Sequence, residues 1–408
     1  MIRGQRLVAL VALVAALLSL AKFDHCRHTG WGSPDVYVHM CYSDLSALYG
    51  AREINKDLWP YSSPTNSVEY PVVTGLVMWG TGLLIGDENG YRQYFDLNAL
   101  LLALLMIGAA ILVWHIRPEF SLLFPLAPAV ISSLYINWDL WAVAPALLSI
   151  FLFIREKFAF SAIALGIAIA TKFFPVVLLL GVAAVLRKRD LTKLFFYIAT
   201  TTLTWLVINA PVALTHFDGW WRFFKLNIDR GNDLGSLWYA LSLLKLPSAD
   251  LNYLSLFIFG AAMVGIWNFA SKISNNRNIY ENFMTIAFIS VAAFVTISKV
   301  YSPQYILWLT PLAVIAMSRR EERSAFWVWQ AGEAIYHVAI WQYLASYTGA
   351  KFGLPTTIYA LLILVRIASL AWFVFALART ALDRRGNTQE SDYSQPNKAG
   401  FLPDSARG

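Results

Sequence analysis

Long apolar stretches separated by short polar segments run along most of the chain. They cover residues 7–20, 96–114, 120–136, 140–154, 158–186, 193–215, 251–270, 280–298, 303–317, 325–345 and 356–378. A helix needs about 20 predominantly apolar residues to cross a bilayer, and such stretches can hold all their backbone hydrogen bonds internally. The stretch 158–186 is too long for one upright helix, and Pro175 inside it breaks a helical ladder, so we expect two short helices there. The pattern therefore predicts an all-α polytopic membrane protein with about twelve transmembrane helices.

Composition agrees with this pattern. Of the 408 residues, 58% are hydrophobic and only 14% are charged, whereas a soluble protein carries about a quarter charged residues. These values exclude a soluble globular domain, a disordered chain and a disulfide-dense secreted module. The net charge is +7, but no basic face interleaved with aromatic residues points to nucleic acid. We attribute the basic balance to cytoplasmic loops and anionic lipid headgroups.

The segment 71–86 decides the predicted topology. If it crosses the membrane, the basic loops alternate between the two sides; if it is re-entrant on the outer side, they all lie on one side. The positive-inside rule favours the re-entrant segment, with both termini cytoplasmic. The N-terminal run follows Arg3 and Arg6 and lacks a small-residue cleavage site, so it predicts a retained first helix. The predicted outer loops are a long first one, 24–95, and then 137–139, 172–174, 216–250, 299–302 and 346–355.

We expect one membrane domain over residues 1–383. Residues 384–408 are rich in Gly, Asn, Gln, Ser and Pro, which predicts a disordered cytoplasmic tail. The outer loops also contain two predicted helices at the membrane surface, one near residues 45–54 and an aromatic one near 220–225.

Three carboxylates at predicted membrane-surface turns are candidates for chemistry. Asp44 follows the first crossing, Glu69 precedes Pro71 at the start of the re-entrant segment, and Asp139 lies in a tight outer turn. Each position also has a structural explanation. An aspartate caps a helix, an acidic residue often accompanies a helix-starting proline, and aspartate is an ordinary turn former.

Three basic residues are candidates for binding an anion. Lys172 lies between two short apolar helices and needs a carboxylate or a phosphate there. Lys299 lies at another outer helix junction, where it either marks the interface or holds a lipid phosphate. Arg230 belongs to a polar outer loop that is either simply solvated or contacts a sugar or phosphate.

Two buried polar positions lie in the predicted last two crossings. Glu333 and His337 are four residues apart, on one helix face. They form either a pair that only satisfies itself or part of a site. Arg366 lies mid-membrane in the last crossing, and the sequence offers no specific partner for it.

Cysteine and histidine usage gives weaker signals. Cys26 and Cys41 are the only cysteines, and both lie in the oxidising first outer loop, so we predict a disulfide between them. Asp24, His25, Cys26 and His28 form a dense cluster without a recognisable metal-ligand spacing. The chain has neither a P-loop nor a dinucleotide fingerprint.

The ordered set of motifs resembles GT-C glycosyltransferases. The resemblance is strongest to the actinobacterial branch that includes the polyprenol-phosphate-mannose-dependent mannosyltransferase elongating phosphatidylinositol mannosides. It runs from about residue 7 to residue 378. After the acidic residue Asp44, the motifs that carry it are Glu69-Tyr70-Pro71-Val72-Val73-Thr74-Gly75, Asn137-Trp138-Asp139-Leu140, Lys172-Phe173-Phe174-Pro175, Lys299-Val300-Tyr301-Ser302-Pro303-Gln304-Tyr305 and Trp329-Gln330-Ala331-Gly332-Glu333.

The resemblance implies an inverting transfer of a sugar, with mannose expected, from a polyprenyl phosphate to a lipid-linked glycan on the extracytoplasmic face of a bacterial plasma membrane. It implies Asp44 as the general base. The candidates for phosphate binding are, in falling order, Lys172, Lys299, Arg230 and His337, and further candidate substrate-binding residues are Tyr301, Glu69 and Asp139.

Some relatives in this superfamily carry a paired acidic motif with a divalent metal. Here a single aspartate follows Tyr42-Ser43, so we expect no metal and no cofactor. The alternatives are the same fold with a polyprenyl-phosphate arabinose or glucose donor, and a polytopic lipid or sugar transporter. A transporter usually shows paired halves, and no such internal symmetry is visible.

Overall fold

The computed structural model describes residues 2–63, 66–86, 90–246, 251–273 and 279–393, and this part of the chain is helical with no strand. Six of its helices are long and apolar enough to span a membrane. They are α1 (Ile2–Lys22), α6 (Gly90–Ile116), α12 (Leu191–Thr215), α15 (Leu251–Ile273), α16 (Ile279–Ile297) and α19 (Thr356–Tyr393).

Further helices complete the bundle. α18 (Glu322–Tyr347) packs along α19, α9 (Leu140–Ile154) along α10 (Phe158–Thr171), and α17 (Ile306–Ala316) against α16. The contact between α10 and α12 is close because of Gly166, where a Cβ atom would come within 2.8 Å of the Thr201 carbonyl oxygen. Small residues of this kind let membrane helices approach each other.

Proline divides two of the apolar stretches. The predicted break near Pro175 is confirmed, since α10 ends at Thr171, Lys172 is extended, and the short helix η2 (Phe174–Val177) leads into α11 (Leu178–Arg189). The stretch 120–136, expected as one unit, is also divided, into α7 (Leu123–Leu126) and α8 (Pro128–Ser133). Ala127 is extended there because a residue before proline avoids helical backbone angles.

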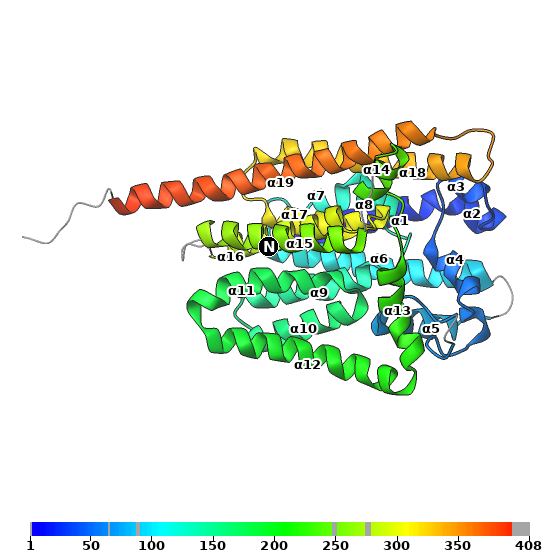
Figure 1. Cartoon of the computed structure of the whole chain (residues 1–408), viewed down its shortest axis with the longest axis horizontal. Helices are drawn as coiled ribbons and strands as arrows, with labels where there is room; N and C mark the ends of the chain where they lie inside the picture. Colours follow the sequence, from blue (N-terminus) through cyan, green and yellow to red (C-terminus); the bar gives the residue numbers. More distant parts are fainter. Residues whose placement is uncertain (1, 64–65, 87–89, 247–250, 274–278, 394–408) are drawn as a thin grey trace, which may run out of the picture.

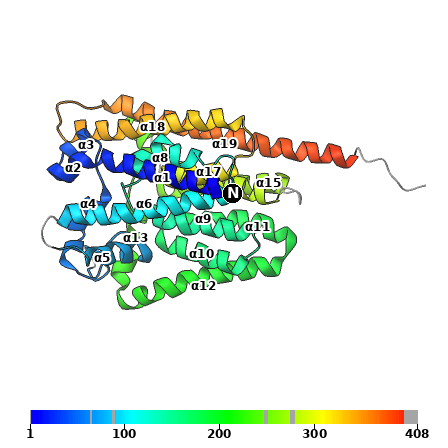
Figure 2. The same cartoon turned by 180° about the vertical axis from the view of Figure 1, so that it is seen from behind.

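Five of the shorter helices lie together at one end of the bundle, here called the loop end. It carries α2 (Asp24–Thr29), α3 (Asp35–Val38), α4 (Asp44–Ala51), α5 (Val72–Gly82) and α13 (Phe217–Asp229). The loop end lies on the right in Figure 1 and on the left in Figure 2, while the C-terminal part of α19 leaves the bundle at the opposite end. The two predicted surface helices correspond to α4 and α13. The predicted re-entrant segment contains α5.

The helix α19 continues past the predicted domain boundary at residue 383 and ends at Tyr393. Arg384 makes an ion pair with Glu281 and donates to the Thr285 hydroxyl, so the first turn beyond that boundary is tied to α16. The segment rich in Gly, Asn, Gln, Ser and Pro therefore begins inside α19 rather than after it. The remainder of the predicted tail, 394–408, lies outside the described residues.

Candidate functional site

A cavity of about 750 Å³ opens at the loop end, and five predicted outer loops contribute to its wall: 24–95, 137–139, 172–174, 216–250 and 299–302. Its volume is in the range of small-molecule sites. The α18 face containing Trp341 closes one side. Aromatic rings dominate the lining, which includes Tyr37, Tyr42, Tyr70, Phe173, Phe174, Trp221, Phe223, Phe224, Tyr305, Trp308 and Trp341.

Asp44 lies in this wall, and it is not the cap of its helix. The N-cap of α4 is Ser43, whose hydroxyl accepts from the Leu45 N–H at 3.2 Å. The Asp44 carboxylate is thereby left for other partners. Its Oδ1 accepts from the Tyr42 hydroxyl at 2.7 Å, and its Oδ2 accepts from Asn137 Nδ2 at 2.6 Å. The structural explanation of this aspartate as a cap is therefore wrong.

Burial raises the pKa of the Asp44 carboxyl above its ordinary value, while the hydrogen bonds from Tyr42 and Asn137 and the charge of Lys172 oppose that shift. A carboxylate with a raised pKa is a stronger base than an exposed aspartate. Asp44 combines this basicity with a position on the cavity wall.

Lys172 reaches the same wall from the break between α10 and η2. Its ammonium donates to Asn137 Oδ1 at 3.1 Å and lies 3.2 Å from Asp139 Oδ1. It also lies 4.8 Å from the centre of the Tyr70 ring. The sequence predicts that Lys172 pairs with a carboxylate or a phosphate, and the structure supplies the carboxylate of Asp139. Lys172 also lines the cavity, where a phosphate could bind beside it.

Asp139 stands behind Lys172 and does not line the cavity. Its Oδ1 also accepts from Trp308 Nε1 at 2.6 Å, and its side chain is fully buried. The sequence predicts a substrate contact for Asp139, but Asp139 is not among the residues that line this cavity. It acts as the buried counter-ion of Lys172.

Arg230 and Lys299 also line the cavity, at the end of α13. Lys299 donates to the Arg230 and Ile228 carbonyl oxygens at 2.7 and 3.1 Å and also to Asn252. It thus satisfies the last carbonyls of α13, a favourable place for a cation. Arg230 makes an ion pair with Asp233 at 2.8 Å, and about a third of its side chain is exposed.

Glu69 lines the cavity, but its carboxylate is already paired. Arg52 forms a bidentate ion pair with it, in which Arg52 Nη2 lies 2.7 Å from Glu69 Oε1. Such bidentate pairs are among the stronger charge contacts. This pair ties α4 to the segment that leads into α5.

His337 and Tyr301, both predicted to bind substrate, are not among the residues that line the cavity. His337 Nε2 lies 3.0 Å from the Lys22 ammonium, and Trp341 Nε1 donates to it at 3.1 Å. Its Nδ1 lies 3.3 Å from the Ser133 hydroxyl. Trp341, the hydrogen-bond partner of His337, does line the cavity.

Glu333 pairs with Arg366 rather than with His337. Arg366 Nε lies 2.8 Å from Glu333 Oε2, and both side chains are almost completely buried. A second arginine nitrogen donates to the Tyr301 carbonyl oxygen at 2.7 Å, and the Tyr301 hydroxyl donates to Glu333 at 2.8 Å. This network joins α18, α19 and the 299–302 turn, which explains Arg366 and gives Tyr301 a structural role.

Sequence reasoning missed Asn137, which bridges the two charged groups of the site. Its amide nitrogen donates to Asp44 and, at 2.7 Å, to the Tyr70 hydroxyl, while its oxygen accepts from Lys172. In the sequence it is an ordinary turn residue. Two signals pointed to it: its position two residues before Asp139 in a predicted outer turn, and its place in the motif Asn137-Trp138-Asp139-Leu140.

Two features lie outside this cavity, in the first loop. Cys26 and Cys41 form the expected disulfide, with a Cα–Cα distance of 6.0 Å. This bond removes Cys26 from the cluster noted at residues 24–28. Within the described residues, the side chains that could together hold a metal are instead His25, Asp35 and His39.

Comparisons with known proteins add no further constraint at this point. Neither protein-family models nor curated protein sequences match this chain.

Proposed function

We propose that this protein is an integral-membrane, inverting glycosyltransferase that moves a sugar, expected to be mannose, from a polyprenyl phosphate to a lipid-linked glycan acceptor. The observation that carries the proposal is the juxtaposition, across Asn137, of a buried carboxylate with a lysine on one cavity wall. Displacement of a phosphate by a hydroxyl needs a base for the hydroxyl proton and cations for the departing phosphate.

Each proposed role follows from a position in the wall. Asp44 takes the proton of the acceptor hydroxyl while the acceptor oxygen attacks C1 of the donor sugar. The bond between C1 and the phosphate oxygen breaks, and polyprenyl phosphate leaves with the electron pair. Lys172 and Arg230 stabilise its negative charge. Attack from the face opposite the phosphate turns a β-linked donor into an α-linked product.

The aromatic lining supports a sugar substrate with a lipid attached. The Tyr37 ring stacks on the rings of Tyr42 and Trp341, and Trp221, Phe223 and Phe224 of α13 also line the cavity. Aromatic rings on an amphipathic helix are typical of elements that lie at a bilayer surface. A lipid-borne substrate could enter the cavity from that surface.

We also propose the predicted topology, with about twelve crossings and the loop end facing outward. Arg117 and Arg384, from two predicted cytoplasmic segments, both pair with Glu281 at the start of α16. Basic residues from separate predicted inner loops thus meet at the end opposite the cavity. This clustering supports the proposed topology, because basic residues collect on the cytoplasmic side of a membrane protein.

The test is a transfer assay with purified protein in lipid nanodiscs. Polyprenyl-phosphate mannose, glucose and arabinose, each radiolabelled, are supplied separately with total membrane glycolipid as acceptor. We expect label to enter the glycolipid from the mannose donor, in a product that α-mannosidase cleaves. Absence of transfer from all three donors, while the protein remains folded, would overturn the proposal.

A further inference from the structure

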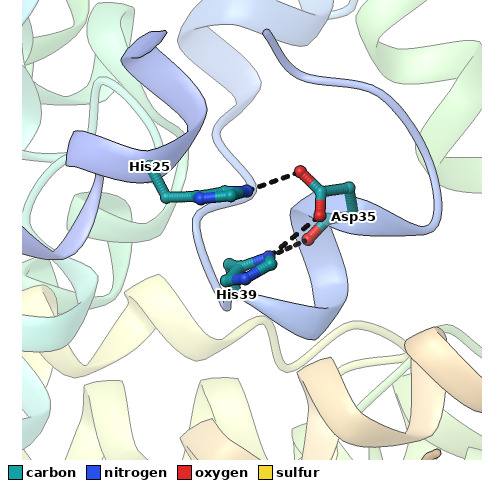
Figure 3. A group of neighbouring side chains, drawn as sticks. All are labelled: His25, Asp35 and His39. Carbon is teal, nitrogen blue, oxygen red and sulfur yellow. Dashed lines mark hydrogen bonds and ion pairs between the residues drawn. The ribbon is translucent and has the colours of Figure 1, made fainter. Parts of the chain in front are cut away.

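Two histidines and an aspartate meet beside α3 (Figure 3). His25 comes from α2, Asp35 begins α3, and His39 directly follows that helix. His25 Nε2 lies 2.7 Å from Asp35 Oδ2, and His39 Nδ1 lies 2.9 Å from Asp35 Oδ1. The imidazole rings stack with their centres 3.5 Å apart.

The three side chains converge as metal ligands do. One ligand atom from each lies within 4.8 Å of those from the other two. Their side chains are between 35% and 44% exposed, so an ion can enter from solvent and water can complete its coordination.

The disulfide positions the two segments that carry these ligands. His25 immediately precedes Cys26, and His39 lies two residues before Cys41. The Cys26–Cys41 bond therefore holds α2 close to the end of α3 whether or not an ion is present. Because the disulfide already holds these segments together, less conformational entropy is lost when the ligands bind an ion.

We propose that His25, Asp35 and His39 form a binding site for one divalent transition-metal ion of the zinc class. Two imidazoles and one carboxylate suit Zn²⁺, Co²⁺ and related ions, whereas Mg²⁺ and Ca²⁺ prefer oxygen ligands alone. The site is separate from the proposed transfer chemistry, since none of its three ligands lines the cavity.

The ion would act on the cavity through the helix that it anchors. Tyr37 lies on α3, between Asp35 and His39 in the sequence. It lines the cavity and stacks on Tyr42 with ring centres 5.8 Å apart. Tyr42 in turn donates to Asp44. Joining α2 to α3 thus holds in place the aromatic wall that orients the candidate base, which makes the proposed metal structural.

The test measures metal binding directly, on full-length protein without a polyhistidine tag. Protein stripped with a chelator is titrated with Co²⁺, whose visible absorption reports coordination by protein ligands, and bound Co²⁺ is then displaced with Zn²⁺. We expect saturation at one equivalent. Loss of a ligand should weaken binding at least about tenfold, the lower bound for disturbing even a residue that only supports a ligand.

Two ligand variants and one matched control make the test specific. His25→Gln and Asp35→Asn should each weaken Co²⁺ binding, while His28→Gln should leave it unchanged. His28 lies on the same short helix and bonds to the Asp24 carbonyl oxygen at 2.8 Å, away from the cluster. An intact disulfide, checked by alkylation and mass measurement, shows that a variant has kept the loop fold.

The results separate this inference from the proposed transferase function, because no readout depends on transfer. Saturable binding that only the ligand variants lose supports the site. Failure of folded wild-type protein to bind Co²⁺ or Zn²⁺ would overturn it. So would equal affinity in His25→Gln and wild type, which would leave the three side chains as a hydrogen-bonded cluster only.

Discussion

Replacing Asp44 with asparagine isolates the proposed proton-accepting role of this side chain. The amide cannot take a proton at neutral pH, and loss of a general base costs about 10² to 10⁴ in rate. At 1.36 kcal/mol per decade, this loss corresponds to about 2.7–5.4 kcal/mol of transition-state stabilisation. We expect Asp44→Asn to bind donor with unchanged affinity and to transfer sugar at least 100-fold more slowly.

The structure indicates that this variant keeps its fold. Ser43, not Asp44, caps α4, so the cap survives. The introduced amide oxygen can still accept from Asn137, and its NH₂ group can donate to the Tyr42 hydroxyl, which is able to reverse its role. The remaining loss is the favourable charge in the first helical turn, worth about 0.3–1 kcal/mol.

The assay compares initial transfer rates in nanodiscs at saturating donor, alongside thermal unfolding of the same samples. Asp57→Asn is the matched control: it makes the same chemical change at an exposed position of the same loop, with a left-handed backbone that asparagine tolerates. If Asp44→Asn keeps more than about a tenth of the wild-type rate, the base lies elsewhere. Glu69 and Glu333 would then be tested, although each is held by an arginine.

Three further outcomes are expected. Lys172→Met should raise the KM for donor and, by leaving Asp139 buried without its cation, lower the free energy of unfolding by about 3–5 kcal/mol. Adding Asp139→Asn should restore stability in thermal unfolding but not donor affinity; recovery of both would contradict a phosphate role. Glu333→Gln should lower the free energy of unfolding by a similar amount, because Arg366 then lacks its counter-ion. Adding Arg366→Met to this variant should recover much of the lost stability. An unaltered melting temperature in Glu333→Gln would refute the structural role of the pair. The rate of transfer should fall as acidification protonates Asp44, and since burial raises that pKa the fall should begin above the value of about 3.9 for an exposed aspartate; a flat pH–rate profile down to pH 4 would exclude Asp44 as the titrating base.

Features that depend on local sequence could be predicted in advance. An apolar run long enough to cross a bilayer can only be helical there, because no water satisfies its backbone groups. The break near Pro175 was equally predictable, since proline has no N–H to donate. The partnership of Cys26 and Cys41 followed from their presence in one predicted oxidising loop.

Partners of the buried charges could not be predicted, because they come from distant parts of the chain. Asp44 and Asn137 are 93 positions apart, and their contact exists only because α4 packs beside the turn before α9. Helical spacing suggested that Glu333 would meet His337 four residues later. Tertiary packing instead brings Arg366 of α19 to Glu333, because a buried carboxylate gains more from a cation than from a neutral ring.

The sequence by itself determined the all-helical class, most of the apolar helices and the polar turns between them, because these depend on hydropathy and backbone chemistry within a few neighbouring residues. It did not separate α7 from α8. Only the tertiary structure decided which polar residues share the cavity and which neutralise one another. It left Asp44, Lys172 and Arg230 in the cavity wall and placed Asp139 behind it. The physical reason is that a charge in a low-dielectric interior takes the nearest counter-charge or hydrogen bond, and packing determines which group is nearest.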